Sequence, residues 1–139
     1  MAETFHLVCA ACGQVLTAGC RIGPLDDYRE DSQDREAPVQ PGVMVILPEA
    51  VVLPIHHPDQ TISERLVSPA GSIVVNPADV LQTALQQSGI DNGCCGSDGC
   101  DGPNRSCRCG QVSATQWADC WTQAEVRFLP DAVLVRSSS

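Results

Sequence analysis

Cysteine carries the clearest chemical signal in this chain, because two distant stretches repeat almost the same pattern. Residues 9–15 read Cys-Ala-Ala-Cys-Gly-Gln-Val and form what we call the first knuckle; residues 107–112 read Cys-Arg-Cys-Gly-Gln-Val and form the second. Cysteines separated by one or two residues let both thiolates face one ion from a tight turn, and the following glycine tolerates the backbone bend. The repeat predicts one metal site made by Cys9, Cys12, Cys107 and Cys109.

The nine cysteines of the chain leave five for a second site. These five are Cys20, Cys94, Cys95, Cys100 and Cys120. A second tetrahedral ion would take four of them and leave one spare thiol. Neighbouring side chains such as Cys94 and Cys95 normally point apart, so one of that pair is the natural spare. The sequence therefore predicts one or two bound ions.

The assignment of cysteines to ions stays open at this point. A rival partition joins the first knuckle to the Gly-rich residues 92–104 and pairs Cys107 and Cys109 with Cys120. A plainer interpretation is that some of these residues, Cys20 above all, are small buried apolar side chains with no ligand role.

The two knuckles resemble those of the zinc-ribbon proteins. The residues that carry this resemblance are Cys9, Cys12 and Gly13 in the first knuckle and Cys107, Cys109 and Gly110 in the second. The second knuckle has one spacer residue where the zinc-ribbon pattern usually has two, and the resemblance covers the knuckles only. It implies structural zinc held by four thiolates.

The ligand chemistry favours a structural zinc protein that acts as a non-catalytic protein-interaction module. A set of four cysteines closes the coordination of zinc, whereas a catalytic zinc keeps one position open. The sequence also lacks the His-Glu-x-x-His motif of zinc hydrolases and the Gly-x-Ser-x-Gly motif of serine hydrolases. The alternative is an iron or iron–sulfur redox protein, because paired cysteine knuckles also hold iron.

The charge of the chain limits its partners. Seventeen acidic residues against eight basic ones give a net charge of −9. Such a chain is repelled by nucleic acid and by anionic lipid, so we expect neither as a partner. A protein with a basic surface is the natural partner, and residues 26–36, with six acidic side chains, are its expected contact. The sequence carries no signal for the oligomeric state.

The compartment follows from the start of the chain and from its apolar content. No basic segment followed by an apolar run precedes Cys9, as a signal peptide would require. The most apolar stretch, residues 43–55, is interrupted by Pro48, Glu49 and Pro54, so it is not expected to span a membrane as a helix. We therefore expect a cytoplasmic protein, and in that reducing compartment clustered cysteines bind metal more often than they form disulfides.

The length and turn content predict a single domain over residues 1–139 of the α+β class, mostly β, with small antiparallel sheets. Ten prolines and eleven glycines indicate short elements and many turns. Residues 26–41 are predicted to be an acidic, proline-flanked loop, and residues 92–110 a metal-binding loop rich in glycine and cysteine. Strands are predicted at 4–8, 14–22, 43–47, 50–55, 72–75, 111–115, 125–129 and 132–135.

One packed helix is predicted over residues 77–88. Asn76 is a suitable N-cap, Pro77 suits the first helical position, and Gly89 can end the helix in a left-handed conformation. The apolar residues of this segment fall at helical spacing, so the helix would pack its apolar face on a sheet.

Overall fold

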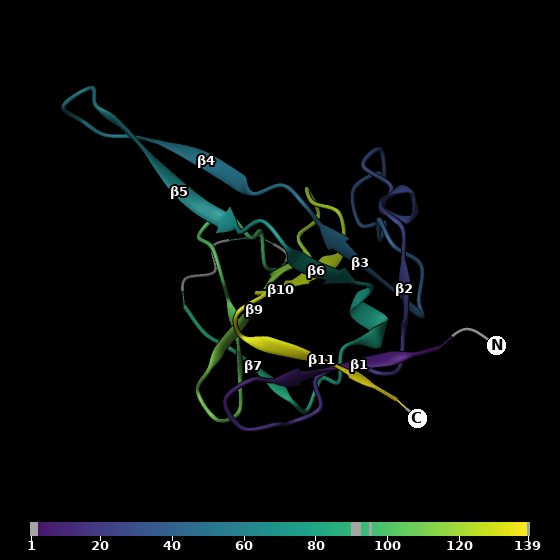
Figure 1. Cartoon of the computed structure of the whole chain (residues 1–139). Helices are drawn as coiled ribbons and strands as arrows, with labels where there is room; N and C mark the ends of the chain where they lie inside the picture. Colours follow the sequence, from purple (N-terminus) through teal and green to yellow (C-terminus); the bar gives the residue numbers. More distant parts are fainter. Residues whose placement is uncertain (1–2, 90–92, 95, 139) are drawn as a thin grey trace.

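The computed structural model of the chain describes residues 3–89, 93–94 and 96–138, which form eleven strands in three sheets (Figure 1). The largest sheet has seven strands, and its only parallel pair among the described residues is β2 with β3. In spatial order its strands are β2 (Arg21–Gly23), β3 (Val43–Leu47), β6 (Ser72–Val75), β10 (Glu125–Phe128), β9 (Val112–Trp117), β8 (Arg105–Cys107) and β7 (Leu85–Gln87).

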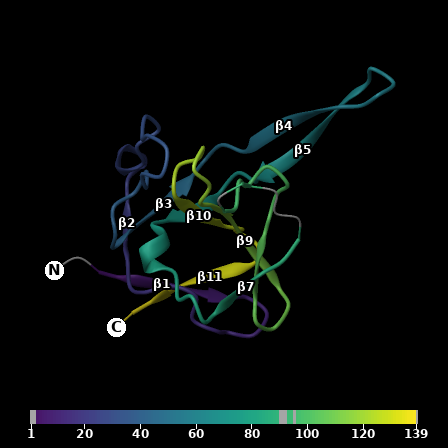
Figure 2. The same ribbon diagram turned by 180° about the vertical axis from the view of Figure 1, so that it is seen from behind.

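The two remaining sheets are antiparallel pairs. β1 (Phe5–Cys9) pairs with β11 (Val133–Ser137), so that Phe5 lies opposite Ser137 and Cys9 opposite Val133. β4 (Val51–His56) pairs with β5 (Ile62–Ser68) in a hairpin that extends away from the rest of the chain in both views (Figures 1 and 2). The β1–β11 pair holds the two ends of the chain together, and the end of β1 carries the first predicted metal ligand.

Two hydrophobic clusters lie on opposite faces of β3. Met44 belongs to the larger cluster, while Val43, Val45 and Leu47 belong to the smaller one, as the alternation of side chains along a strand requires. Burial on both faces accounts for the apolar residues of β3 other than Ile46, which is 48% exposed. The larger cluster joins the β1–β11 pair to the seven-stranded sheet, and it includes Cys9 and Cys107.

The helix predicted over residues 77–88 is wrong. Asn76 does act as a cap, because its side-chain oxygen accepts a hydrogen bond from the backbone N–H of Ala78 at 2.8 Å. The cap begins only a single 3-10 turn, η2 (Pro77–Asp79), and Val80 is already extended, with φ −80° and ψ 132°. Within the described residues the class is therefore mostly β, with no α-helix, rather than α+β with a packed helix.

The tertiary surroundings explain why the apolar spacing did not form a helix. Val80 forms a bridge with Thr17, and the N–H of Leu81 donates to the carbonyl of Leu16 at 2.9 Å. Leu85 then begins β7, which pairs with β8. Two short extended pieces around a turn bury Val80 and Leu85, and their backbones hydrogen-bond to residues 16–17 and to β8.

No helix of the described residues is long and apolar enough to cross a bilayer. The only other helical element that they contain is η1 (Leu25–Asp27), a single 3-10 turn.

Candidate metal centre

The four knuckle cysteines meet at one point of the structure. The sulfur atoms of Cys9 and Cys109 are 3.7 Å apart, and those of Cys12 and Cys107 are 3.5 Å apart. All four sulfur atoms lie within 4.8 Å of one another. Thiolates around a tetrahedral ion with bonds of about 2.3 Å lie about 3.8 Å from each other. The four sulfur atoms are thus placed so that they can hold a metal ion.

The first knuckle is a tight turn that follows β1. The N–H of Gly13 donates to the carbonyl of Cys9, and the N–H of Cys9 donates to the carbonyl of Gln14, both at 2.8 Å. Gly13 has a φ of +78°, a left-handed conformation that glycine adopts without a steric cost. The backbone N–H of Gln14 hydrogen-bonds to the sulfur of Cys12. The turn therefore directs both a sulfur and a backbone donor toward the same point.

The second knuckle repeats this arrangement between β8 and β9 with one residue fewer. The N–H of Gly110 donates to the carbonyl of Cys107, and the N–H of Cys107 donates to the carbonyl of Gln111, again both at 2.8 Å. Gly110 has a φ of +99°, and the N–H of Gln111 hydrogen-bonds to the sulfur of Cys109. The repeated sequence thus forms the same hydrogen-bonded turn twice, and the shorter spacer leaves the pattern unchanged.

Regular structure fixes one cysteine of each knuckle. Cys9 is the last residue of β1 and Cys107 is the last residue of β8, and both are buried in the larger cluster. Cys12 and Cys109 are exposed. The side chain of Arg108 donates to the carbonyl of Thr83 at 2.9 Å, which holds the second knuckle against the turn before β7. An ion at this point would be covered on the core side and open to solvent on the other.

The thiols of the second knuckle differ in acidity. Burial raises the pKa of Cys107 to about 12, whereas the hydrogen bond from the backbone N–H of Gln111 lowers the pKa of Cys109 to about 7. Cys109 is therefore the more readily ionised thiol of the two. Hydrogen bonds from backbone N–H groups to sulfur also stabilise the thiolate form that metal ions require.

A second group of donor atoms lies after β9. The sulfur atoms of Cys94 and Cys120 are 3.3 Å apart, and the sulfur of Cys94 is 3.6 Å from Oδ1 of Asp119. The donor atoms of these three side chains lie within 4.8 Å of one another. Asp119 was not among the residues predicted from the sequence, although its position directly before Cys120 was a usable signal. Cys95, another predicted ligand, lies outside the described residues.

Cys20 and Cys100 lie in neither group. Cys20 is fully buried, its backbone pairs with that of Phe5, and its thiol donates to the carbonyl of Ala18 at 3.5 Å. Cys100 is exposed, and its backbone N–H donates to the carboxylate of Asp98 at 3.0 Å. The sequence predicts both as candidate ligands of a second ion, but in the structure neither belongs to a group of donor atoms.

The three histidines belong to neither group of donors. His56 ends β4, and the ring of His57 hydrogen-bonds to the hydroxyl of Ser63 at 2.7 Å across the β4–β5 hairpin. The ring of His6 contacts the carbonyl of Thr17 at 3.0 Å.

Comparison with known proteins adds no family to this description. No protein-family model matches the chain, and neither the curated proteins nor the solved structures contain a match to it.

Proposed function

We propose that this chain is a structural zinc-binding protein that acts as a non-catalytic protein-interaction module. The observation that carries the zinc assignment is the convergence of Cys9, Cys12, Cys107 and Cys109, with sulfur–sulfur distances of 3.5 Å and 3.7 Å in two opposed pairs. Four thiolates fill the tetrahedral coordination of zinc and leave no position for a substrate. This donor set supports a structural role over a catalytic one.

A zinc ion at this point would stabilise the fold over a long stretch of the chain. The two sulfur pairs join residues 100 and 95 positions apart. A cross-link that closes a loop of this length lowers the conformational entropy of the unfolded chain. Zinc binding by structural sites is worth about 10–16 kcal/mol in small zinc-finger peptides, a gain that is coupled to folding.

Iron is the alternative ion, because four thiolates with hydrogen bonds from backbone N–H groups also suit an iron centre. In that case the protein would transfer electrons. Iron–thiolate centres absorb visible light and zinc centres do not, so the colour of the purified protein separates the two.

The proposed contact surface is the acidic segment at residues 26–36. This segment is hydrogen-bonded to the loop before β10: the N–H of Arg35 donates to the carbonyl of Thr122 at 2.7 Å, and the N–H of Ala124 donates to the carbonyl of Glu36 at 2.9 Å. Tyr28 anchors its other end, because its hydroxyl donates to the carboxylate of Glu125 at 2.8 Å. A segment attached at both ends presents its acidic side chains in a fixed arrangement.

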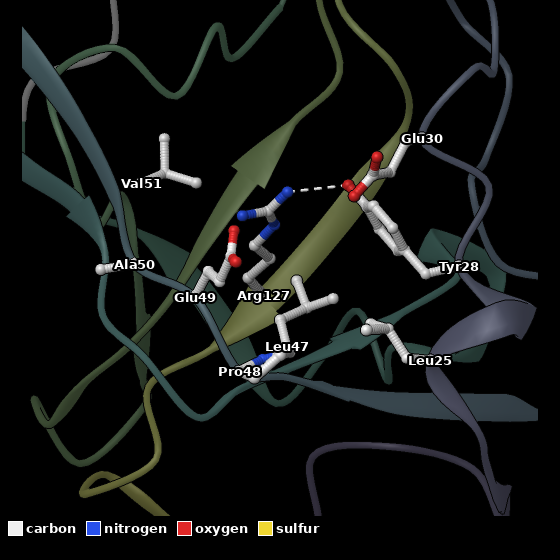
Figure 3. A pocket seen from close by; sticks show the side chains of 9 residues that line it. All are labelled: Leu25, Tyr28, Glu30, Leu47, Pro48, Glu49, Ala50, Val51 and Arg127. Atoms are coloured by element: carbon white, nitrogen blue, oxygen red, sulfur yellow. Dashed lines mark hydrogen bonds between the residues drawn. The ribbon is translucent and has the colours of Figure 1, made fainter.

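The proposed surface includes a pocket beside this segment (Figure 3). Arg127 points into the pocket and donates to the hydroxyl of Tyr28 at 2.7 Å. Glu30 and Glu49, both exposed, lie on opposite sides of it. Because Arg127 is already paired with Glu125 at 2.7 Å, the two exposed glutamates are the charges that an incoming basic side chain would meet.

The zinc assignment is tested with Cys109→Ser, and Cys100→Ser is the matched control because both cysteines are exposed. Zinc affinity is measured by competition with a chromogenic chelator in reduced protein. We expect Cys109→Ser to weaken zinc binding by more than about a hundredfold, since even changes beside zinc ligands weaken binding by about 10–100-fold. Cys100→Ser should match the original chain at this site. Unchanged affinity in Cys109→Ser would reject the four-cysteine site.

The interaction surface is tested with a synthetic arginine-rich peptide as the probe. We expect the double variant Glu30→Gln, Glu49→Gln to bind the peptide more weakly than the original chain, with a smaller dependence on salt. The double variant Glu64→Gln, Asp131→Asn makes the same change in net charge at exposed positions away from the pocket. An equal loss of binding in both double variants would show that only net charge matters and would reject this surface.

A further inference from the structure

The donor group after β9 has the spacing of a metal site of its own. A tetrahedral ion bound by two thiolates and one carboxylate oxygen places the sulfurs about 3.8 Å apart and each sulfur about 3.5 Å from the oxygen. The observed distances are 3.3 Å between the sulfurs of Cys94 and Cys120, and 3.6 Å from the sulfur of Cys94 to Oδ1 of Asp119. The sulfur–oxygen distance agrees with this geometry to about 0.1 Å, and the sulfur–sulfur distance is about 0.5 Å shorter than it requires.

Local hydrogen bonds hold Asp119 and Cys120 in place. Asp119 is 5% exposed, and its Oδ1 accepts a hydrogen bond from the backbone N–H of Cys120 at 2.9 Å. The backbone N–H of Asp119 donates to the hydroxyl of Thr122 at 3.1 Å, and the N–H of Thr122 donates to the carbonyl of Asp119 at 3.1 Å. The turn after β9 therefore presents a buried carboxylate and a thiol side by side.

The glycines of the Gly-rich segment explain how Cys94 reaches this turn. A Cβ on Gly93 would lie 3.1 Å from the carboxyl carbon of Asp119, a Cβ on Gly96 would lie 2.7 Å from the carbonyl oxygen of Ala118, and a Cβ on Gly99 would collide with the ring of Trp117. Gly93, Gly96 and Gly99 thus lie with their bare backbone against residues 117–119, and Gly93 also lies directly against Gly96. This close packing brings the sulfur of Cys94 next to that of Cys120.

We propose that Cys94, Asp119 and Cys120 form a second site for a thiophilic divalent cation of the zinc and cadmium class, independent of the four-cysteine site. Binding of Zn²⁺ would release the two thiol protons to solvent and form two zinc–sulfur bonds and one zinc–oxygen bond. Because two thiolates and one carboxylate together carry three negative charges, the site with bound Zn²⁺ has a net charge of −1. A mixed set of sulfur and oxygen donors selects such a cation over Mg²⁺ or Ca²⁺, which take oxygen ligands only.

This second site differs from the four-cysteine site in its donor set. It offers two thiolates and one carboxylate, whereas the other site offers four thiolates, and both sites have buried and exposed ligands. Three protein ligands hold a zinc ion less tightly than four thiolates, which fill its tetrahedral coordination. The ion at the second site is therefore the first to leave when a chelator is added, and a chain loaded with two ions passes through a form with one ion.

The test uses the full, reduced chain loaded with Zn²⁺ and analysed by native mass spectrometry during a chelator titration. The original chain should carry two ions and lose one at a lower chelator concentration. Cys120→Ser should carry one ion, and Asp119→Asn, which keeps an oxygen acceptor for the N–H of Cys120, should weaken the second ion by about tenfold or more. Cys100→Ser, the control, should keep two.

Two results would overturn the second site: a single ion in the original chain at saturating Zn²⁺, or two ions retained in both Cys94→Ser and Cys120→Ser. Loss of the other ion in Cys109→Ser reports on the four-cysteine site, so failure of the proposed function and failure of this inference give different patterns.

A measurement on the unmodified chain removes any dependence on the folding of variants. Thiols bound to metal react slowly with iodoacetamide, so saturating Zn²⁺ should protect Cys94 and Cys120 while Cys100 is alkylated at the same rate with and without metal. Equal alkylation of Cys94 and Cys120 in the two conditions would contradict the second site.

Discussion

At the scale of single residues, Cys20 shows how a cysteine can be structural in a chain in which six other cysteines belong to two groups of donor atoms. Its thiol is fully buried in the larger hydrophobic cluster, and burial, together with the charge of Asp79, raises its pKa to about 12. A free cysteine side chain in such a place behaves as a small apolar residue. Its spacing from the first knuckle did not distinguish this role from that of a ligand.

We predict that Cys20→Ala leaves the number of bound zinc ions unchanged and flattens the loss of stability at alkaline pH. Because the pKa of Cys20 is raised in the folded state, the thiol keeps its proton while the unfolded chain ionises above about pH 8.5. Its contribution is therefore complete below that pH and is lost as the pH rises toward 12.

Urea unfolding of zinc-loaded protein at about pH 7, 9 and 10 measures this difference. The free energy of unfolding should fall more steeply with pH for the original chain than for Cys20→Ala. Parallel slopes for the two proteins would contradict the assignment of this thiol to the core.

A second residue-scale prediction concerns the hydroxyl of Tyr28. It donates to Glu125 at 2.8 Å and accepts from Arg127 at 2.7 Å, and the side chain of Glu125 is only 3% exposed. Tyr28→Phe leaves the buried Glu125 and the half-buried Arg127 with one partner fewer each, so we expect a loss of about 1–3 kcal/mol in the free energy of unfolding. Chemical denaturation measures it.

The matched control is Ser32→Ala, which removes an exposed hydroxyl from the same acidic segment. It should change the free energy of unfolding by no more than about 0.5 kcal/mol. If Tyr28→Phe were equally mild, the buried network would not anchor the segment.

At the scale of elements, the two knuckles form the same hydrogen-bonded turn with spacers of different length. Substitution of their glycines tests whether this turn is needed for metal binding. Gly13 and Gly110 have φ values of +78° and +99°, and a Cβ on either would meet no atom within 4 Å. Alanine at these positions therefore adds backbone strain of about 1–2 kcal/mol without a steric collision. We predict that Gly13→Ala and Gly110→Ala both lower stability and speed the removal of zinc by a chelator.

Gly42→Ala is the control for these two variants. Gly42 has a φ of +85° and equally open surroundings, but it lies before β3 and outside both knuckles. It should lower stability by a similar amount and leave the rate of zinc removal unchanged. Faster zinc removal in Gly42→Ala would mean that the effect follows global stability rather than knuckle geometry.

The strands show which elements the local sequence pattern can predict. The apolar run at 43–47 and the segment at 72–75 were predicted as strands and are β3 and β6. The helix predicted over residues 77–88 is wrong because the same apolar spacing also occurs in a chain that turns and pairs first with residues 16–17 and then with β8. Those pairings depend on the tertiary fold and cannot be seen in the local sequence. β7 and β8 are three residues each and too short to produce a recognisable alternation.

At the scale of the whole molecule, the repeated knuckle predicts a contact between residues far apart in the sequence, which secondary-structure propensities cannot do. It predicted that residues 100 positions apart would meet, and the structure brings those sulfurs to 3.7 Å. The proximity of Asp119 to Cys94 could not be predicted in the same way, because it depends on glycine backbone packing against residues 117–119. The sequence predicts Cys94 and Cys120 as candidate ligands and places Asp119 directly before Cys120, but it does not show that Asp119 and Cys94 meet.

Removal of zinc should affect the whole fold, because the four-cysteine site joins the β1–β11 pair to the seven-stranded sheet. Closure of a loop of about 100 residues is worth about 4.7 kcal/mol in the chain-entropy estimate. We therefore expect chelation to lower the Tm by more than about 10 °C. Cys109→Ser, which lacks one ligand, should already melt at a low temperature and respond little to the chelator.

The most direct test of the central claim is native mass spectrometry combined with elemental analysis of the protein purified under reducing conditions. The four-cysteine site predicts at least one zinc ion for each folded chain, and the proposed second site raises this number to two. Iron in place of zinc would favour the redox alternative. A folded chain with all thiols reduced and no bound metal would contradict the claim that the two knuckles form a metal site.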